Sequence, residues 1–174
     1  MFRVFLHKKI LITCILNGEI MIRLFVVAVL LVGLNNFAYC DDTKEVEKFF
    51  NNYVAAANSY DSNYFDYYSD DAKIIRVVEK NNGSKESVNV PLERYKCEAK
   101  RSTKLMKLRQ YKNYYFNVKI FPHGKDYKIV ALRMPSTSNY KIPAHFIVGK
   151  NSNGEWKIKE ESMNTKVQTF LKHS

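Results

Sequence analysis

The spacing of the apolar residues limits most strongly which folds this chain can adopt, because it changes from a helical to a strand period along the sequence. Across residues 44–60 the apolar side chains recur at the spacing of one helix face: Val46, Phe49, Phe50, Tyr53, Val54 and Ala57. From residue 114 onward they favour strands, in the segments 114–121, 127–134, 140–148 and 156–162. Helices followed by a run of strands predict an α+β domain rather than an alternating α/β fold.

The residues between these two parts predict a two-stranded hairpin, with one further helix before it and one after it in the sequence. Residues 62–68 are strongly aromatic and predict a short helix, while residues 72–79 and 87–90 predict two strands. Pro91 can begin a third helix, over residues 91–110, because the first helical turn needs no N–H from it. The buried stripe expected on this helix is Leu92, Tyr95, Ala99, Leu105, Met106 and Leu108. The complete pattern predicts three N-terminal helices packed on the concave face of a cone-shaped, curved antiparallel sheet.

An apolar run of eleven residues, 24–34, follows a basic residue near the N-terminus. Ala38 and Cys40 then supply small residues where a signal peptidase needs them. A membrane-spanning helix needs about 20 apolar residues, so this run is too short to anchor the chain. Residues 1–40 are therefore expected to be a signal segment, and residues 41–174 one exported domain, periplasmic or secreted.

Three other readings of this N-terminal segment stay open. Met21 can be the true start, since residues 21–40 alone contain a complete signal. The whole segment can also be an unusually long signal or a retained anchor. Acylation of Cys40 would make the chain a lipoprotein, but the bulky Tyr39 stands where that cleavage needs a very small residue.

Cleavage after Cys40 would leave Cys97 as the only cysteine of three, so no internal disulfide could form. A domain of this size without disulfides must be stabilised by its hydrophobic core. Residues 1–40 contain four of the 28 basic and one of the 17 acidic residues, which leaves a net charge of +8 on the rest. This charge favours anionic ligands or surfaces, and export argues against nucleic acid as a partner.

Three short motifs accompany this order of elements: Tyr53-Val54-Ala55-Ala56, Tyr67-Tyr68-Ser69-Asp70-Asp71-Ala72 and Asn153-Gly154-Glu155-Trp156-Lys157-Ile158. The Asn153-Gly154 pair also predicts a hairpin between the last two strands. Order and motifs together resemble the nuclear transport factor 2-like superfamily, in its polyketide-cyclase-like and ketosteroid-isomerase-like branch, with this chain as an exported bacterial member. The superfamily includes isomerases, cyclases, dehydratases and many non-catalytic domains, so the fold alone does not decide the chemistry.

The resemblance also implies positions for the three functional residues of the isomerases. Tyr53 falls where they carry an oxyanion-stabilising tyrosine, Arg76 where they carry the general base, and Ala144 where they carry a protonated acid. Arginine stays protonated and cannot accept a proton, and alanine cannot donate a hydrogen bond. The resemblance therefore argues against isomerase chemistry by this route. Tyr53 also lies on the apolar stripe of the first helix, so a packing role in the core is the alternative.

Four residues are candidates for a ligand pocket inside the cone: Tyr53, Arg76, Arg133 and His145. If the alignment holds, Arg76 points into the cone beside Tyr53, where a guanidinium could hold an anionic headgroup. The alternative is that Arg76 pairs with a carboxylate such as Asp70 or faces water. His, Cys and carboxylate residues show no metal-ligand spacing, so neither a metal nor another cofactor is expected.

The third predicted helix, 91–110, is strongly basic. It carries Arg94, Lys96, Lys100, Arg101, Lys104, Lys107 and Arg109, offset only by Glu93 and Glu98. Such a face could dock an acidic protein or an anionic envelope surface. The alternative is a solvated helix face without a partner.

These observations favour a non-catalytic binding or assembly module with a small cone-shaped pocket for an anionic or amphipathic ligand. One alternative is a small isomerase, dehydratase or cyclase-type enzyme that uses His145 or Tyr53 in another role. A second is a component of a cell-envelope or secretion assembly that docks through the basic helix. The resemblance also implies a homodimer formed through the outer face of the sheet.

Overall fold

The structure is a computed structural model that describes residues 42–173. The predicted signal segment, residues 1–40, and the alternative start at Met21 lie outside these residues. From Thr43 onward the chain forms one compact unit. Among the described residues, no helix combines the length and the apolar character needed to cross a membrane.

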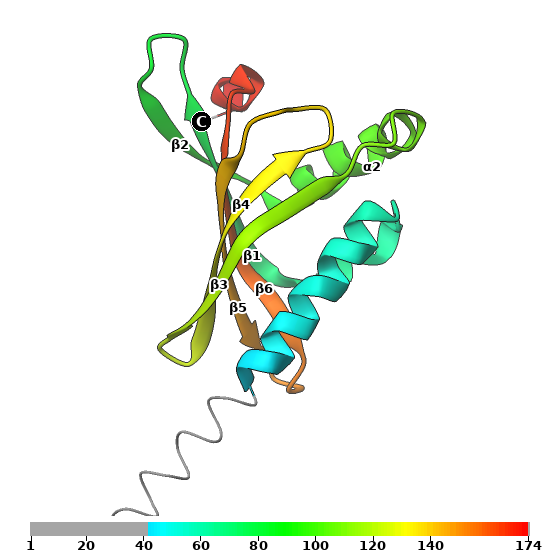
Figure 1. Cartoon of the computed structure of the whole chain (residues 1–174), viewed down its shortest axis with the longest axis vertical. Helices are drawn as coiled ribbons and strands as arrows, with labels where there is room; N and C mark the ends of the chain where they lie inside the picture. Colours follow the sequence, from blue (N-terminus) through cyan, green and yellow to red (C-terminus); the bar gives the residue numbers. More distant parts are fainter. Residues whose placement is uncertain (1–41, 174) are drawn as a thin grey trace, which may run out of the picture. The chain divides into compact units, whose positions relative to one another are not determined.

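The described chain begins with a helix over residues 42–58, here called the N-terminal helix. The 3-10 helix η1 (Ser62–Tyr67) leads into the hairpin of β1 (Tyr68–Glu79) and β2 (Lys85–Val90), and α2 (Leu92–Leu108) follows. The remaining elements are β3 (Asn113–His123), β4 (Asp126–Pro135), β5 (Ile142–Lys150), β6 (Trp156–Thr165) and the 3-10 helix η2 (Gln168–His173). Figure 1 shows the N-terminal helix and α2 on the same side of the sheet. The α+β class expected from the sequence is confirmed.

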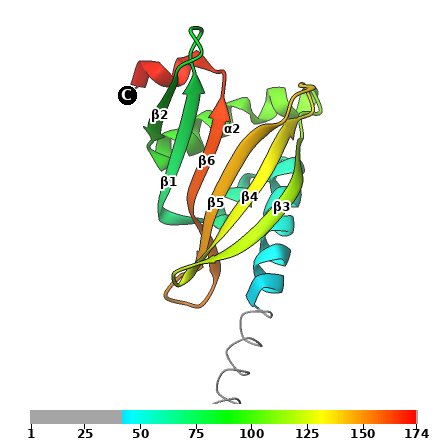
Figure 2. The same cartoon turned by 60° about the vertical axis from the view of Figure 1, so that its left-hand side comes forward.

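The six strands form one open sheet in the order β2-β1-β6-β5-β4-β3 (Figure 2). Every neighbouring pair is antiparallel except β1 and β6, which are parallel. The sheet is therefore mixed and not wholly antiparallel as expected. The reason is topological: the last strand of the β3–β6 meander pairs with β1 and runs in the same direction, and no local sequence pattern specifies this long-range pairing.

The core lies between the N-terminal helix and the inner face of the sheet. Val46 and Phe50 of the helix are buried, as the helical spacing predicts. The Phe50 ring lies 5.1 Å from the ring of Phe146 on β5, in an edge-on arrangement that aromatic pairs prefer. Ile74 of β1 and Ile158 of β6 are fully buried on the same side of the sheet. Each such side chain contributes about 1.5–3 kcal/mol by leaving water, so this face dominates the stability of the domain.

The buried stripe expected on α2 is only partly correct. Leu92 is buried, but Leu105 is 48% exposed and Leu108 is 81% exposed. The C-terminal half of α2 instead turns Ser102 and Thr103 toward the interior, where both hydroxyls donate to the carbonyl of Ala99 at 2.9 Å. The two inward hydroxyls form their hydrogen bonds within the helix, so they can line a cavity without a further partner. The two leucines lie on the solvent side of the helix.

Candidate functional site

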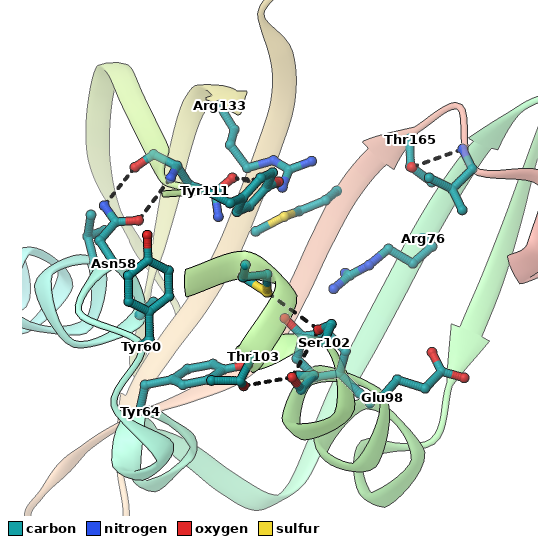
Figure 3. A pocket seen from close by; sticks show the side chains of 18 of the residues that line it. Asn58, Tyr60, Tyr64, Arg76, Glu98, Ser102, Thr103, Tyr111, Arg133 and Thr165 are labelled. Carbon is teal, nitrogen blue, oxygen red and sulfur yellow. Dashed lines mark hydrogen bonds between the residues drawn. The ribbon is translucent and has the colours of Figure 1, made fainter. Parts of the chain in front are cut away.

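A cavity of about 480 Å³ lies between the N-terminal helix, α2, η2 and the inner face of the sheet (Figure 3). This volume falls in the range of about 300–1,000 Å³ that is usual for small-molecule sites. Its walls combine aromatic rings and apolar side chains with two guanidinium groups, those of Arg76 on β1 and Arg133 on β4. Figure 3 shows these two arginines reaching the cavity from different strands.

A buried hydrogen-bonded network forms the floor beneath this cavity. Glu161 on β6 is fully buried, and its Oε1 accepts a hydrogen bond from Nη2 of Arg76 at 2.6 Å. Its Oε2 accepts hydrogen bonds from the hydroxyls of Tyr53, at 3.2 Å, and of Tyr68. The two hydroxyls also lie 2.8 Å apart. Both carboxylate oxygens of Glu161 are therefore occupied, by three donors from two elements, the N-terminal helix and β1.

The electrostatics of this network keep Arg76 charged and the hydroxyls of Tyr53 and Tyr68 protonated. Burial by itself would lower the pKa of Arg76, but the Glu161 carboxylate outweighs burial and the pKa is raised. Burial, and then the charge of Glu161, raises the pKa of Tyr53 and of Tyr68 well above the usual value. The network thus consists of one guanidinium and two neutral hydroxyls that donate to one carboxylate.

Arg76 faces the cavity with its charge already compensated. Its guanidinium carbon lies 5.0 Å from the ring centre of Tyr95 and 6.0 Å from that of Phe170, so the cation also lies within cation–π distance of two aromatic rings. The expectation that Arg76 lies beside Tyr53 agrees with the geometry, since both contact Glu161. The alternative of a carboxylate partner also holds, although the partner is Glu161 and not Asp70.

Arg133 has a different environment at the other end of the cavity. Its Nη1 donates to Oδ1 of Asn113 at 3.1 Å, and Tyr111 donates to the same oxygen at 3.2 Å. The side chain of Asn58, at the end of the N-terminal helix, bonds to the backbone N and O of Asn113 at 2.8 and 2.9 Å. Asn113 is therefore fixed, and it orients the guanidinium. Within residues 42–171, no carboxylate forms an ion pair with Arg133.

His145 does not join the other three candidates. Its neighbour Ala144 is fully buried on the inner face of β5, and side chains alternate along a strand, so His145 lies on the outer face. Partial burial and the nearby charge of Lys128 lower the pKa of His145. The structure therefore brings Tyr53, Arg76 and Arg133 to the cavity and corrects the placement of His145.

Two positions that the sequence resemblance singles out, those of Arg76 and Ala144, lie close together on the inner face of the sheet. Arg76 pairs across the sheet with Met163, which pairs on its other side with Ala144. The one carboxylate in the cavity wall is Glu98, and it bonds to Arg94 at 2.8 Å on the surface of α2. In the part of the chain that the structure describes, no three His, Cys, Asp or Glu side chains are grouped so as to hold a metal ion.

Sequence reasoning missed Glu161, Tyr68 and Phe170. A register shift in the pairing of β5 with β6 explains why Glu161 was missed: Val148 pairs with Ile158, but Ile147 pairs with Glu160. The extra residue turns Glu161 to the inner face of the sheet. An unbroken alternation from Ile158 would have placed Glu161 on the outer face. Phe170 belongs to η2, a segment with no recognisable spacing of apolar residues.

Comparisons with known proteins support the fold. No family model matches the sequence, and no curated protein matches it. An NTF2-like protein with a cystatin-like fold from Novosphingobium aromaticivorans has a TM-score of 0.54 at 11% identity, covering 78% of this chain and 92% of that one. An NTF2-like protein of unknown function from Pseudomonas putida KT2440 has a TM-score of 0.53 at 11% identity, covering 70% and 84%.

A third similar structure is a chain of the yeast deubiquitinase Ubp3 and Bre5 cofactor complex, with a TM-score of 0.52 at 19% identity, covering 70% of this chain and 93% of that one. Sequence identities this low establish the fold and not the function, because proteins with this fold have many unrelated functions. The described domain thus has the nuclear transport factor 2-like fold, as the sequence motifs indicate.

Proposed function

We propose that this domain with the nuclear transport factor 2-like fold is a non-catalytic binding module that holds a small amphipathic anion in its cavity. The observation that carries the proposal is a charge imbalance in one cavity, which two guanidinium groups approach. The carboxylate of Glu161 pairs with Arg76 and that of Glu98 with Arg94 of α2, so among the described residues Arg133 has no ion-pair partner. An anionic ligand would supply the charge that Arg133 lacks.

The rest of the cavity wall suits the apolar body of such a ligand. Val54 and Ala57 of the N-terminal helix, Met106 of α2, Met163 of β6 and Phe170 of η2 all line it. Concave sites lined mainly by apolar and aromatic groups, with a few fixed polar ones, are the usual form of small-molecule sites. A molecule with one charged end and one apolar end would satisfy both parts of the wall.

The absence of catalysis is supported by what the polar groups can do. A general base must accept a proton, and in the described residues around the cavity the buried carboxylate of Glu161 already accepts from three donors. The raised pKa of Tyr53 keeps that hydroxyl protonated, and Arg76 stays cationic. These three groups stabilise a binding cavity and offer no proton acceptor to a substrate, and Glu98, the carboxylate of the cavity wall, is bonded to Arg94 at 2.8 Å.

Native mass spectrometry of the protein purified gently from its own host tests the proposal. A bound small molecule should appear as a mass increment that is lost in Arg133→Gln and kept in Arg109→Gln, a matched change at an exposed arginine. An unliganded mass for the wild type would count against ligand capture. Chemical turnover of the captured molecule by the purified protein would show that the domain is an enzyme.

A second candidate function is docking on an anionic envelope surface through α2. The exposed Leu105 and Leu108 lie among exposed basic residues of that helix and its C-cap: Lys100, Arg101, Lys104, Lys107 and Arg109. Of the basic side chains on α2, only Arg94 and Lys96 form ion pairs within the described domain. Each basic residue near an anionic bilayer contributes about 1 kcal/mol, and two exposed leucines add apolar contact.

Sedimentation with vesicles tests this second candidate. The protein should pellet with phosphatidylglycerol vesicles and not with phosphatidylcholine vesicles, and the double change Lys104→Glu, Lys107→Glu should abolish pelleting. The same charge change at Lys80 and Lys125, outside α2, is the matched control. Equal pelleting with both kinds of vesicle would contradict a specific electrostatic surface.

A further inference from the structure

Tyr60 adopts a backbone conformation that its residue type disfavours. It ends the N-terminal helix with φ of 62°, in the left-handed region. Asp61 N donates to the carbonyl of Ala56 at 3.3 Å, and Tyr60 N donates to that of Ala57 at 3.4 Å. This is the hydrogen-bonding pattern of a helix C-cap in which glycine usually takes the left-handed position. A bulky aromatic residue at this position is strained, and strain of this kind is common at functional sites.

The Tyr60 side chain is also left without a partner. Its hydroxyl is shielded from water, and it has no hydrogen bond, in a residue that lines the cavity. In the described residues only one other side-chain atom shares this condition, Nε of Arg133, which belongs to the same cavity wall. Buried polar atoms are nearly always hydrogen-bonded, so two unpaired donors at one cavity require an explanation.

The geometry of Arg133 indicates what kind of group would pair with it. Nη1 donates to the neutral amide of Asn113, which leaves the edge formed by Nε–H and Nη2–H without a hydrogen bond among the described residues. These two N–H groups are parallel and match the two oxygens of a carboxylate. Figure 3 shows the Tyr60 ring and Arg133 at the cavity, with Arg76 entering from another side. Arg76 cannot serve in the same way, because Nη2 already bonds to Glu161.

We infer that Tyr60 and Arg133 form the headgroup site of the cavity and that this site takes the carboxylate of a small amphipathic acid. Nε is shielded from water, so the guanidinium must turn slightly on binding to present its Nε–H and Nη2–H donors to the carboxylate. The Tyr60 hydroxyl donates to one of the two carboxylate oxygens. One guanidinium and one hydroxyl match a single negative charge better than the two charges of a phosphate monoester. The inference rests on the proposed binding function and deepens it.

Calorimetric titration with a matched pair of probes tests this site. Decanoic acid carries the carboxylate, and decan-1-ol has the same chain without the charge. The wild-type protein should bind decanoate at least about tenfold more tightly than decanol, since a hydrogen-bonded charge adds this much or more. Arg133→Gln should weaken decanoate binding about ten- to a hundredfold and leave decanol binding nearly unchanged.

Tyr60→Phe should weaken decanoate binding several-fold, because it removes one hydroxyl donor and keeps the ring. Arg133→Lys should recover part of the affinity lost in Arg133→Gln, since it restores the charge without the parallel donors. Arg109→Gln and Tyr114→Phe, at exposed positions, should leave both affinities unchanged. If Arg133→Gln does not fold, Tyr60→Phe and Arg133→Lys still test the site.

Failure of the carboxylate site and failure of the proposed binding function would give different results. If both probes bind the wild type with equal affinity and Arg133→Gln retains decanoate, the carboxylate site is refuted while a binding cavity remains. If neither probe binds and the purified protein carries no small molecule, the proposed function fails and the headgroup site fails with it.

Discussion

Nη2 of Arg76 lies 2.6 Å from Oε1 of Glu161, and both side chains are buried on the inner face of the sheet. The two residues come from the parallel strands β1 and β6, so the ion pair joins the hairpin at one end of the sheet to the meander that forms the other. Tyr53 extends the pair to the N-terminal helix by donating to Glu161. Arg76 and Glu161 thus connect the sheet to the helical layer of the domain.

Breaking the Arg76–Glu161 pair from one side should be costly. Arg76→Met or Glu161→Gln leaves a buried charge without its partner, and we expect each to lower the free energy of unfolding by about 3–5 kcal/mol. The double change Arg76→Met, Glu161→Leu should lose less than either single change, because no charge remains buried. Urea denaturation followed by circular dichroism measures all three.

A surface ion pair provides the control for this experiment. Arg94 and Glu98 on α2 are 2.8 Å apart but solvent-exposed, so Arg94→Met should cost less than about 1 kcal/mol. Similar losses for Arg94→Met and Arg76→Met would show that burial of the inner pair adds nothing.

Stability should fall in alkaline solution because of the buried tyrosines. The pKa of Tyr53 and of Tyr68 is raised above the ordinary value of 10.0, first by burial and then by Glu161. Below pH 10 both hydroxyls are protonated in the folded and the unfolded chain, so their contribution is complete. Above pH 10 only the unfolded chain ionises them, and the free energy of unfolding should fall by up to about 1.4 kcal/mol per pH unit for each tyrosine.

Urea denaturation on either side of pH 10 measures this slope. Tyr53→Phe should reduce this slope by the contribution of one tyrosine. Tyr114→Phe, at an exposed position, should leave the slope unchanged. A stability that stays constant above pH 10 would contradict the buried network.

Two tyrosine-to-phenylalanine changes should have opposite effects on stability. Tyr60→Phe removes a buried hydroxyl that has no partner, so we expect the free energy of unfolding to rise by about 1 kcal/mol. Tyr53→Phe removes a hydroxyl that bonds to Tyr68 and Glu161, so we expect a loss of about 1–3 kcal/mol. Thermal and urea denaturation of the two variants measure the difference, and a loss of stability in Tyr60→Phe would mean that its hydroxyl has a partner in solution.

The export expected from the sequence predicts a defined mature N-terminus. Cleavage after Cys40 would make Asp41 the first residue of the mature protein, because Ala38 and Cys40 are the small residues that the peptidase needs. N-terminal sequencing of the protein recovered from its host should read Asp-Asp-Thr-Lys-Glu. An intact N-terminus in the cytoplasmic fraction would contradict export, and a lipid-modified Cys40 would identify the chain as a lipoprotein.

Local patterns in the sequence were sufficient for most elements of the fold. The helical spacing around Phe50 predicts the buried face of the N-terminal helix, and the Asn153-Gly154 pair predicts the last hairpin, where Gly154 has φ of 79°. Alternation along β1 and β4 is also enough to turn Arg76 and Arg133 to the same face of the sheet as the core. Each of these features depends only on residues close in sequence.

The tertiary structure alone decided the remainder. The parallel pairing of β1 with β6, the partner of Arg76 and the unpaired hydroxyl of Tyr60 depend on segments far apart in the chain. Glu161 faces the interior because β6 contains one extra residue in its pairing with β5, and the energy of that irregularity depends on what the two strands bury together. The sequence by itself therefore determined which segments become helices and strands, since neighbouring residues set the period. Packing between distant strands decided which charges meet beside the cavity and which one, that of Arg133, has no ion-pair partner among the described residues.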